Sequence, residues 1–437
     1  MVETTAYLAL GSNEGDRAAH LARAVERLAT VPGVRAVRAS PWHESAFVGD
    51  GPPQAAFLNG AVELRTTLSP EALLGVAKAL EAEAGRRLPA PRHHPRPLDV
   101  DLLFYGDRTI DTRDLVVPHP RWHEREFVRA PLRALGLDLD ALPRWQRPEV
   151  ITIAAEFAAR CSTWHAGGCV VGLVPTMGAL HDGHASLLRR ARGECDRTAA
   201  TIFVNPLQFG PGEDFAAYPR DLAGDLRVCA AADVDVVFAP EPAAMYDPDF
   251  CSHVAVGRAA ETMEGALRPG HFAGVATVVA RLLALARPHR AFFGEKDAQQ
   301  LAVIRRMVLD LGFPTAVVPC PIVREADGLA RSSRNVYLSV EDRRASTVLH
   351  RALASARHAF QRGERDRDAL LQRARAVLAS EPRAALDYVE LRRDEDLAPL
   401  PPGPVDGGRL LVAARFTGGV RPVRLLDNLS LTAVEAP

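Results

Sequence analysis

Two histidines spaced three residues apart, His181 and His184, are the side chains of this sequence best suited to nucleotide chemistry. They follow the apolar run 170–174, typical of a buried parallel strand, and precede residues 185–192, which have the composition of a helix. The first turn of a helix presents unpaired N–H groups and a positive dipole end, which suit a phosphate. Two imidazoles at i and i+3 lie on one helical face and can donate to the same phosphate oxygens. The alternative is a pair of surface histidines beside a glycine turn, and the complete strand–turn–helix context favours the nucleotide site.

A second pattern is the pair of carboxylates at Asp99 and Asp101. Because side chains alternate along a strand, these two share one face while Leu98, Val100 and Leu102 share the other. Two carboxylates on one face can hold Mg²⁺, which prefers oxygen ligands and usually also binds nucleotide phosphates. Nearby arginines could neutralise such phosphates, namely Arg86, Arg92, Arg96 and Arg125. Taken alone, the same pattern is more often a solvated strand face.

The elements around the carboxylates predict an α+β domain. Strands are expected at 5–10, 34–40 and 56–68, with an amphipathic helix over 16–30 and a second helix from 70 to about 85. A further strand carries the two aspartates. This order suggests a sandwich with an antiparallel sheet, similar to the ferredoxin-like plan.

Residues 142–148 break this pattern and form the best candidate for a domain boundary. Beyond them the sequence alternates between helix and strand, with a helix at 152–166, a strand at 170–174, a helix at 185–193 and a strand at 199–204. Alternation continues to about residue 322 and predicts an α/β domain. Ligands in such sheets bind beyond the carboxyl ends of the strands, where the histidine motif and Asn205 fall.

Length, composition and net charge limit the classes of protein to which this chain can belong. A chain of 437 residues, 47% of them apolar, is expected to form two or three domains with full cores. The net charge of -1 argues against a nucleic-acid or membrane-surface binder. No apolar run approaches the length of a membrane span and the N-terminus does not begin a signal peptide, so the six cysteines are expected to be reduced thiols of a cytoplasmic protein.

The basic residues are unusually biased, because only two of the 53 are lysine, Lys78 and Lys296. A chain so rich in arginine is expected to keep lysine mainly where a compact ammonium is needed. Lys296 follows an apolar strand and Gly294, a position where a point charge could meet a phosphate. An exposed lysine at a helix start is the alternative.

Residues 1 to about 145 resemble the 6-hydroxymethyl-7,8-dihydropterin pyrophosphokinases of folate synthesis. The matching segments occur in the family's order and are 9–13, 57–62, Glu81 with Gly85-Arg86, 95–102, 117–119, Arg125 and Phe127. The resemblance implies Mg²⁺ on Asp99 and Asp101, and the pterin ring between Phe57 and Phe127 with Asn59 at its edge. It also implies that Arg86, Arg96, His119 and Arg125 hold ATP or its phosphates, while the pterin hydroxymethyl oxygen attacks the β-phosphorus.

Residues 150–437 resemble pantothenate synthetase, the pantoate–β-alanine ligase family. The resemblance is carried by segments 175–184, 205–209, 268–275, 292–300 and 323–335. It implies domains at 1–147, 148–322 and 323–437: the pyrophosphokinase domain, a Rossmann-like domain of the HIGH-motif nucleotidyl-transfer type and a smaller α+β domain that closes over the site. It also implies a homodimer.

The ligase resemblance assigns roles to individual residues. ATP would be surrounded by Met177, Gly178, Ala179, Leu180, His181, Asp182, Gly183, His184, Gly294, Glu295, Lys296, Asp297, Val323, Arg331, Ser332, Ser333 and Arg334. Gln208 and Gln300 would hold pantoate, with Asn205 close by, and His184 would be the general acid or phosphate donor. Pantoate carboxylate would attack the α-phosphorus, and the amine of β-alanine would then displace AMP.

The sequence therefore predicts a bifunctional enzyme that uses ATP, Mg²⁺ and small-molecule substrates. One alternative keeps the ligase but makes the first domain a structural module without catalysis. A different HIGH-type nucleotidyltransferase is a third interpretation, and it leaves Gln208, Gln300 and the serine–arginine segment 331–334 unexplained together.

Overall fold

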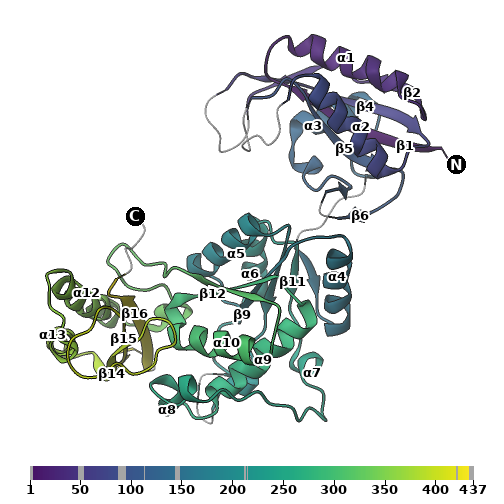
Figure 1. The fold of residues 1–437 in the computed structure, drawn as a ribbon. Helices are drawn as coiled ribbons and strands as arrows, with labels where there is room; N and C mark the ends of the chain where they lie inside the picture. Colours follow the sequence, from purple (N-terminus) through teal and green to yellow (C-terminus); the bar gives the residue numbers. More distant parts are fainter. Residues whose placement is uncertain are drawn as a thin grey trace. The chain divides into compact units, whose positions relative to one another are not determined.

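The computed structural model describes residues 3–47, 54–86, 95–112, 114–142, 148–210, 213, 215–419 and 422–432. Arg92 lies outside these residues. The chain divides into two compact units, Met1–Gln146 and Arg147–Pro437 (Figure 1).

The smaller unit is built on an antiparallel sheet in the order β2-β4-β1-β5, with β3 paired to the end of β4. Its strands are β1 (Thr4–Ser12), β2 (Val34–Ala39), β3 (His43–Ser45), β4 (Phe57–Thr66) and β5 (Asp99–Tyr105). Its helices are α1 (Arg17–Thr30), α2 (Pro70–Glu83) and α3 (Glu126–Ala134), and its short elements are β6 (Ile110–Asp111), β7 (Val116–Val117) and η1 (Trp122–Glu124).

Local sequence explains these elements. Asp16 and Ser69 cap the N-termini of α1 and α2 by accepting backbone N–H groups, and Pro70 occupies the first turn of α2. Alternation in the strands divides the apolar side chains between two cores, one beneath α1 and α2 and one beneath α3. Asp99 and Asp101 belong to the α3 face, because Val100 and Leu102 fill the other core.

The larger unit contains a six-stranded parallel sheet in the order β13-β12-β9-β10-β11-β8. This confirms the α/β prediction. The strands are β8 (Glu149–Ile151), β9 (Val171–Thr176), β10 (Arg197–Ile202), β11 (Val236–Phe238), β12 (Arg290–Gly294) and β13 (Ala316–Cys320). Helices α4 (Ala154–Ala166), α9 (His271–Ala286) and α10 (Ala298–Asp310) share one core with the sheet, and α5 (Asp182–Glu194) and α6 (Leu222–Ala231) share the other. Its shorter elements are η2 (Pro206–Gln208), α7 (Pro242–Met245), η3 (Arg258–Ala260), α8 (Glu264–Leu267) and η4 (Glu295–Asp297).

The C-terminal part of this unit has its own core under an antiparallel sheet, β14-β15-β16. The strands are β14 (Ala385–Arg392), β15 (Arg409–Phe416) and β16 (Val423–Ser430), and the helical elements are η5 (Ser333–Tyr337), α11 (Val340–Ala345), α12 (Val348–Gln361) and α13 (Arg367–Ala379). Asn428 on β16 joins this sheet to the parallel-sheet part, because its amide donates to the carbonyls of Glu295 (2.8 Å) and Lys296 (2.9 Å).

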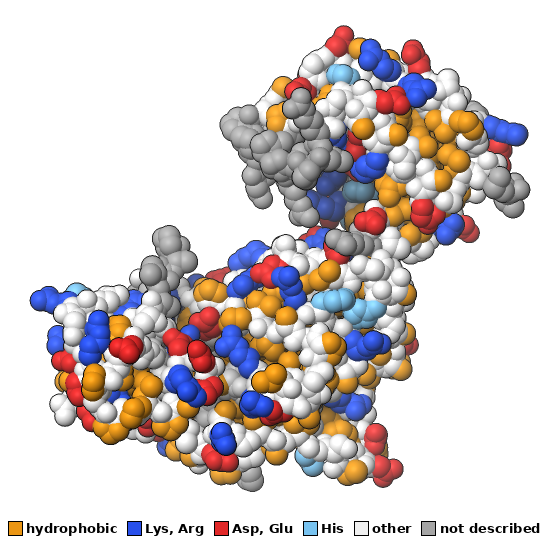
Figure 2. Space-filling view, in the orientation of Figure 1, with side chains coloured by type: hydrophobic (Ala, Val, Ile, Leu, Met, Phe, Trp, Pro, Cys, Tyr) orange, Lys and Arg blue, Asp and Glu red, His pale blue; other side chains and the backbone are white. Residues whose placement is uncertain are grey.

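The surface matches the balanced charge of the chain. Basic and acidic side chains are interspersed over the visible face of each unit (Figure 2). None of the six cysteines forms a disulfide bond in the described residues, and Cys251 is the exposed one among them. Among the described residues, no helix is both long and apolar enough to span a membrane.

Candidate functional sites

A cavity of about 930 Å³ opens where β9, β10 and β12 of the larger unit end at their carboxyl termini. It brings together most of the side chains that the sequence singled out. Its lining includes Met177, His181, Gly183, His184, Asn205, Gln208, Gly294, Lys296, Asp297, Gln300, Val323, Arg331, Ser332, Ser333 and Arg334. Gly178, Ala179, Leu180, Asp182 and Glu295 are not part of this lining.

The two histidines form the N-terminal cap of α5, so the helix begins three residues earlier than its predicted start at 185. His181 is the N-cap residue in extended conformation, and its Nδ1 accepts the N–H of Gly183 at 3.1 Å. His184 is the third helical residue, and its Nδ1 accepts the N–H of His181 at 3.3 Å. The rings lie 4.2 Å apart between centroids. Because each Nδ1 accepts, each neutral ring carries its proton on Nε2 as a donor.

Burial and nearby positive charge keep both imidazoles neutral. Burial, followed by the Lys296 ammonium and the Arg331 guanidinium, lowers the pKa of His181 to about 4. Burial, with smaller contributions from His181 and Lys296, lowers the pKa of His184 to about 3. The Lys296 side chain is 20% exposed, and its Nζ lies 3.8 Å from Asp297 Oδ1. The site therefore offers two neutral N–H donors and one ammonium to an anion.

A buried carboxylate holds the turn before the histidines. Asp225 on α6 accepts the N–H of Ala179 at 3.0 Å and that of Leu180 at 2.7 Å. Gly178 and Ala179 both have positive φ, and a Cβ on Gly178 would lie 2.8 Å from Asp225 Oδ2. Sequence reasoning did not identify Asp225, because a lone aspartate in a helix gives no sign that it meets a turn 45 residues earlier.

Asn205 orients Gln208 within the protein. Its Oδ1 accepts from Leu207 N–H and Tyr246 O–H, and its amide donates to Gly274 O and Gln208 Oε1, both at 3.1 Å. These four contacts use its hydrogen-bonding capacity. They also fix the orientation of the Gln208 amide, whose Nε2 lies 3.1 Å from Met177 Sδ and lines the cavity.

Glu295, which was predicted to contact ATP, and Gln299, next to the predicted Gln300, make structural contacts. Glu295 lines a separate cavity of about 260 Å³ and pairs with Arg409 at 3.2 Å. Gln299, beside Gln300, is buried and donates to the carbonyls of Ala259 and Thr262, at 2.8 and 2.7 Å. Gln299 lines the cavity beside Gln300 but uses its amide within the protein, whereas Glu295, unlike Lys296, does not line this cavity.

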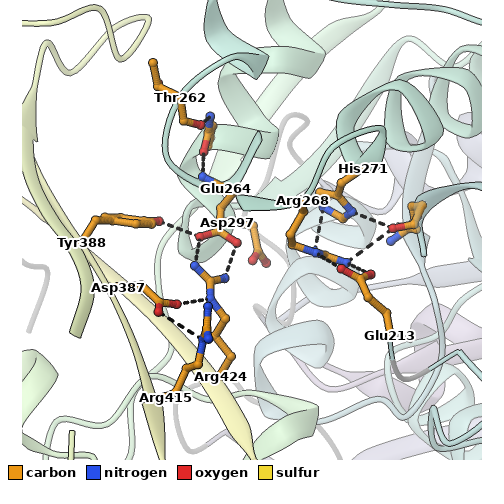
Figure 3. A network of polar contacts seen from close by, with 12 residues as sticks. Glu213, Thr262, Glu264, Arg268, His271, Asp297, Asp387, Tyr388, Arg415 and Arg424 are labelled. Carbon is orange, nitrogen blue, oxygen red and sulfur yellow. Dashed lines mark hydrogen bonds and ion pairs between the residues drawn. The ribbon is translucent and has the colours of Figure 1, made fainter. Parts of the chain in front are cut away.

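An ionic network on the C-terminal side of the cavity was not apparent in the sequence. Glu264, 5% exposed, receives hydrogen bonds from both terminal nitrogens of Arg424 on β16 and from Tyr388 O–H on β14 (Figure 3). Asp387 in turn pairs with Arg424 and Arg415. The network ties α8 to the antiparallel sheet across one wall of the cavity.

In the smaller unit, strand register assembles the other candidate site. Gly11 on β1 pairs with Asn59 on one side and Asp99 on the other. A Cβ on Gly11 would lie 3.3 Å from Asn59 Oδ1, 3.7 Å from the Phe57 ring and 4.0 Å from Asp99 Cβ. The glycine thus leaves room where the predicted pterin-binding and metal-binding side chains converge.

Arginines surround the Asp99 carboxylate. Arg86 lies 2.6 Å from Asp99 Oδ1, and Arg96 lies 2.9 Å from Asp99 Oδ2. Burial opposes ionisation of Asp99, but the guanidiniums of Arg96 and Arg86 outweigh it and hold the pKa below its ordinary value. The buried Glu81 helps to hold Arg86 in place. It accepts hydrogen bonds from Arg86 (2.6 Å), Lys78 (3.0 Å) and the N–H of Val100 (2.9 Å).

The environment of Asp101 disfavours its ionised form. Burial, and then the neighbouring Asp99 carboxylate, raises the pKa of Asp101 to about 6. A divalent cation would relieve this repulsion, so the carboxylate pair fits Mg²⁺. In the described ranges no group of three or more His, Cys, Asp or Glu could hold a metal.

The other predicted residues of this unit lie around the same sheet face. Phe57 and Asn59 are on β4, and the Asn59 amide donates to Ser45 Oγ at 3.0 Å. Arg125 immediately precedes α3, and its guanidinium lies 5.8 Å from the centroid of the Phe127 ring. His119 follows β7, and its Nδ1 accepts the N–H of Arg121 at 3.3 Å.

Comparison with known proteins agrees with both resemblances. Residues 149–430 match the family described as pantoate-beta-alanine ligase, and residues 7–136 match 7,8-dihydro-6-hydroxymethylpterin-pyrophosphokinase. The pantothenate synthetase of Roseiflexus castenholzii is 52% identical over 65% of this chain and 99% of its own length. A bifunctional pantoate ligase/cytidylate kinase of Synechococcus is 52% identical over 61% of this chain and 49% of its own length.

Solved structures show the same relationship for the larger unit. Pantothenate synthetase from Thermus thermophilus is 47% identical, with a TM-score of 0.61, and the match covers 65% of this chain and all of that one. A pantoate-beta-alanine ligase from Francisella tularensis, described as complexed with beta-gamma ATP and beta-alanine, is 30% identical with a TM-score of 0.53, over 66% of this chain and 99% of that one. The chain belongs to the pantoate–β-alanine ligase family and joins that ligase to a 6-hydroxymethyl-7,8-dihydropterin pyrophosphokinase domain in one bifunctional enzyme.

Proposed function

We propose that the histidine cap of α5 holds the phosphates of ATP while pantoate carboxylate attacks the α-phosphorus. The observation that carries this proposal is the pair of Nδ1 acceptor contacts, which leaves both Nε2–H groups of His181 and His184 as donors at a helix N-terminus. Lys296 adds the ammonium. These groups stabilise charge on the pentavalent phosphorus, and pyrophosphate leaves as pantoyl adenylate forms.

In the same site, Gln208 and Gln300 hold pantoate, and Asn205 acts by orienting the Gln208 amide. Val323 and Arg331 to Arg334 bind the nucleotide from the other side of the cavity. Gly178 to Leu180, Asp182, Glu295 and Asp297 belong to the ATP-binding segments, with the backbone of 178–180 set by Asp225. In the second step, the amine of β-alanine attacks the adenylate carbonyl and AMP leaves.

For the smaller unit we propose that Asp99 and Asp101 hold Mg²⁺, which would neutralise the ATP phosphates. Phe57 and Phe127 sandwich the pterin and Asn59 contacts its edge. Arg86, Arg96, Arg125 and His119 orient the triphosphate so that the pterin hydroxymethyl oxygen can attack the β-phosphorus in line and AMP can leave. The convergence of Phe57, Asn59 and Asp99 on Gly11 supports this assignment.

We further propose the domain limits 1–147, 148–322 and 323–437, a ferredoxin-like plan for the first domain and a homodimer through the ligase part. The strand order β2-β4-β1-β5 supports the ferredoxin-like plan, in which the first strand lies in the middle of the sheet. Light scattering on the purified protein tests the dimer, which is refuted by the mass of a single 47.2 kDa chain.

The experiment that tests the two functions measures AMP released from ATP with each substrate set in turn. Pterin alone should release AMP through the smaller unit, and pantoate with β-alanine should do so through the larger unit. Release in the second assay but not the first would make the smaller unit the inert module of the alternative interpretation. Failure of the second assay would contradict the ligase assignment.

A further inference from the structure

The segment Arg268–Val275 carries part of the resemblance to the ligase family, yet none of its residues has a role in the proposed mechanism. In the structure it follows α8 and begins α9, which packs against η2. Figure 3 shows Arg268, His271 and Glu213 pointing toward one another, and all three line the cavity.

Hydrogen bonds connect Arg268 to His271 and His271 to the backbone of Gln208. His271 Nδ1 lies 2.9 Å from Gln208 O, and His271 Nε2 lies 3.1 Å from Arg268 Nη1. Because a carbonyl only accepts, Nδ1 must carry the proton, and Nε2 of the neutral ring accepts from the guanidinium. Burial, followed by the Arg268 charge, lowers the pKa of His271 and keeps that ring neutral.

Glu213 is the last residue in this series of hydrogen bonds. Its carboxylate receives two hydrogen bonds from Arg268, from Nε at 2.7 Å and from Nη2 at 2.6 Å, and the pair is largely removed from solvent, with side chains 20% and 26% exposed. A bidentate pair of this kind fixes the plane of the guanidinium. Arg268 Nη2 also reaches Gln208 O at 3.4 Å.

Backbone packing brings the two segments together. A Cβ on Gly274 would lie 2.2 Å from Leu207 O and 2.6 Å from Gln208 N, so only glycine allows the first turn of α9 to approach η2 this closely. Asn205 then orients the side-chain amide of Gln208, while His271 holds its backbone carbonyl.

We propose that Glu213, Arg268 and His271 are positioning residues that set the affinity for pantoate by fixing the backbone of Gln208. The proposal rests on the proposed role of Gln208 in holding pantoate. The three residues act through Gln208, so the nucleotide side of the site should not depend on them.

The test compares two substitutions of one histidine. In His271→Asn the amide nitrogen stands near the position of Nδ1 and can still donate to Gln208 O, whereas His271→Gln places its amide near Nε2 and loses that bond. With one hydrogen bond contributing about 1 kcal/mol, His271→Gln should raise the KM for pantoate in adenylate formation by about fivefold to tenfold. His271→Asn should stay within about twofold, and the KM for ATP should remain unchanged in both.

Controls separate this proposal from the function on which it rests. Thermal melting of each variant, beside the exposed-site variant His253→Asn, verifies that the fold survives. Gln208→Ala should itself raise the KM for pantoate, and adding His271→Gln to it should then change little, because the two act as one unit. If Gln208→Ala leaves that KM unchanged, the assigned role of Gln208 is wrong. If Gln208→Ala raises it but His271→Asn and His271→Gln behave alike, or if the two effects are additive, the positioning proposal is overturned.

Discussion

The two units differ in the charged and neutral groups that their proposed ATP sites contain. The smaller unit gathers full charges, two aspartates and several arginines, and its Asp101 has a pKa raised by burial and by Asp99. The larger unit offers neutral imidazoles, amides and a helix N-terminus, together with the cations Lys296 and Arg331 beside the histidines. Under the proposed functions, a metal held by the aspartates would assist attack at the β-phosphorus, whereas the histidine cap would assist attack at the α-phosphorus. The two units should therefore respond differently to loss of charge.

The largest expected effect follows from removing the metal-binding charge. Replacing Asp99 and Asp101 together with Asn keeps side-chain volume but removes both carboxylates, so pyrophosphokinase activity should fall to background. Ligase activity should stay within about twofold of wild type, because its cavity is formed by residues 175–428. Both rates are measured by AMP release on one preparation.

The exposed substitution Asp107→Asn in the same unit serves as the control. Loss of both activities in a folded double variant would show that the sites are coupled, which contradicts the comparison above.

In the ligase unit, His184→Asn tests the phosphate-donating role of His184 apart from its capping hydrogen bond. Asn can still accept the N–H of His181 near the position of Nδ1, but it has no donor at the position of Nε2. Adenylate formation should fall by about 10²–10³-fold, whereas attack of β-alanine on supplied pantoyl adenylate should change far less. Single-turnover measurement of each step checks this. Collapse of the second step with survival of the first would refute the role assigned to His184.

Lys296→Arg tests whether the ligase site needs a point charge. The substitution retains one positive charge but replaces a compact ammonium with a planar fork beside His181 and Asp297. We expect the rate of adenylate formation to fall by about 10- to 100-fold, corresponding to roughly 1.4–3 kcal/mol. Arg306→Lys, at an exposed arginine paired with Asp310, is the matched control. A near-wild-type rate for Lys296→Arg would mean that any cation suffices there.

The smallest effect is a dependence of stability on pH. His181 and His184 have folded pKa values of about 4 and about 3, below the ordinary value of 6.5, so the unfolded chain binds more protons between these limits. The ligand-free ligase unit should lose stability as pH falls from about 6.5 toward 4, by at most about 1.4 kcal/mol per pH unit for each histidine. Urea unfolding at pH 7 and pH 5.5 checks this.

The comparison variant for the pH series is His184→Asn, which lacks one of the two groups and should show a shallower loss between the same pH values. Equal slopes in wild type and variant would indicate that His184 is already accessible to protons in the folded state. Saturating ATP should also reduce the slope, since phosphate charge stabilises the protonated rings.

Much of this protein can be derived from its sequence because the signals are local. Apolar runs and capping residues predicted the first strands and helices of each unit, and family models confirm the two resemblances that the motifs indicated. Strand alternation placed Asp99 and Asp101 on one face, and the strand–turn–helix order placed the histidines at a helix start. Each of these inferences needs only the period of an element and the chemistry of a few neighbouring side chains.

Only the tertiary structure shows which side chains from distant segments contact one another. Asp225 meets the turn at 178–180, His271 meets Gln208, and Arg424 meets Glu264 across 160 residues of sequence, and each partner is an ordinary polar residue until the fold brings it close. The contacts of neighbouring side chains at a helix start also depend on the fold. Glu295 lies outside the cavity that Lys296 lines, and Gln299 donates to a backbone carbonyl although it lines the cavity beside Gln300. Sequence period specifies which face a residue shares, but burial and pKa depend on which other elements pack against that face.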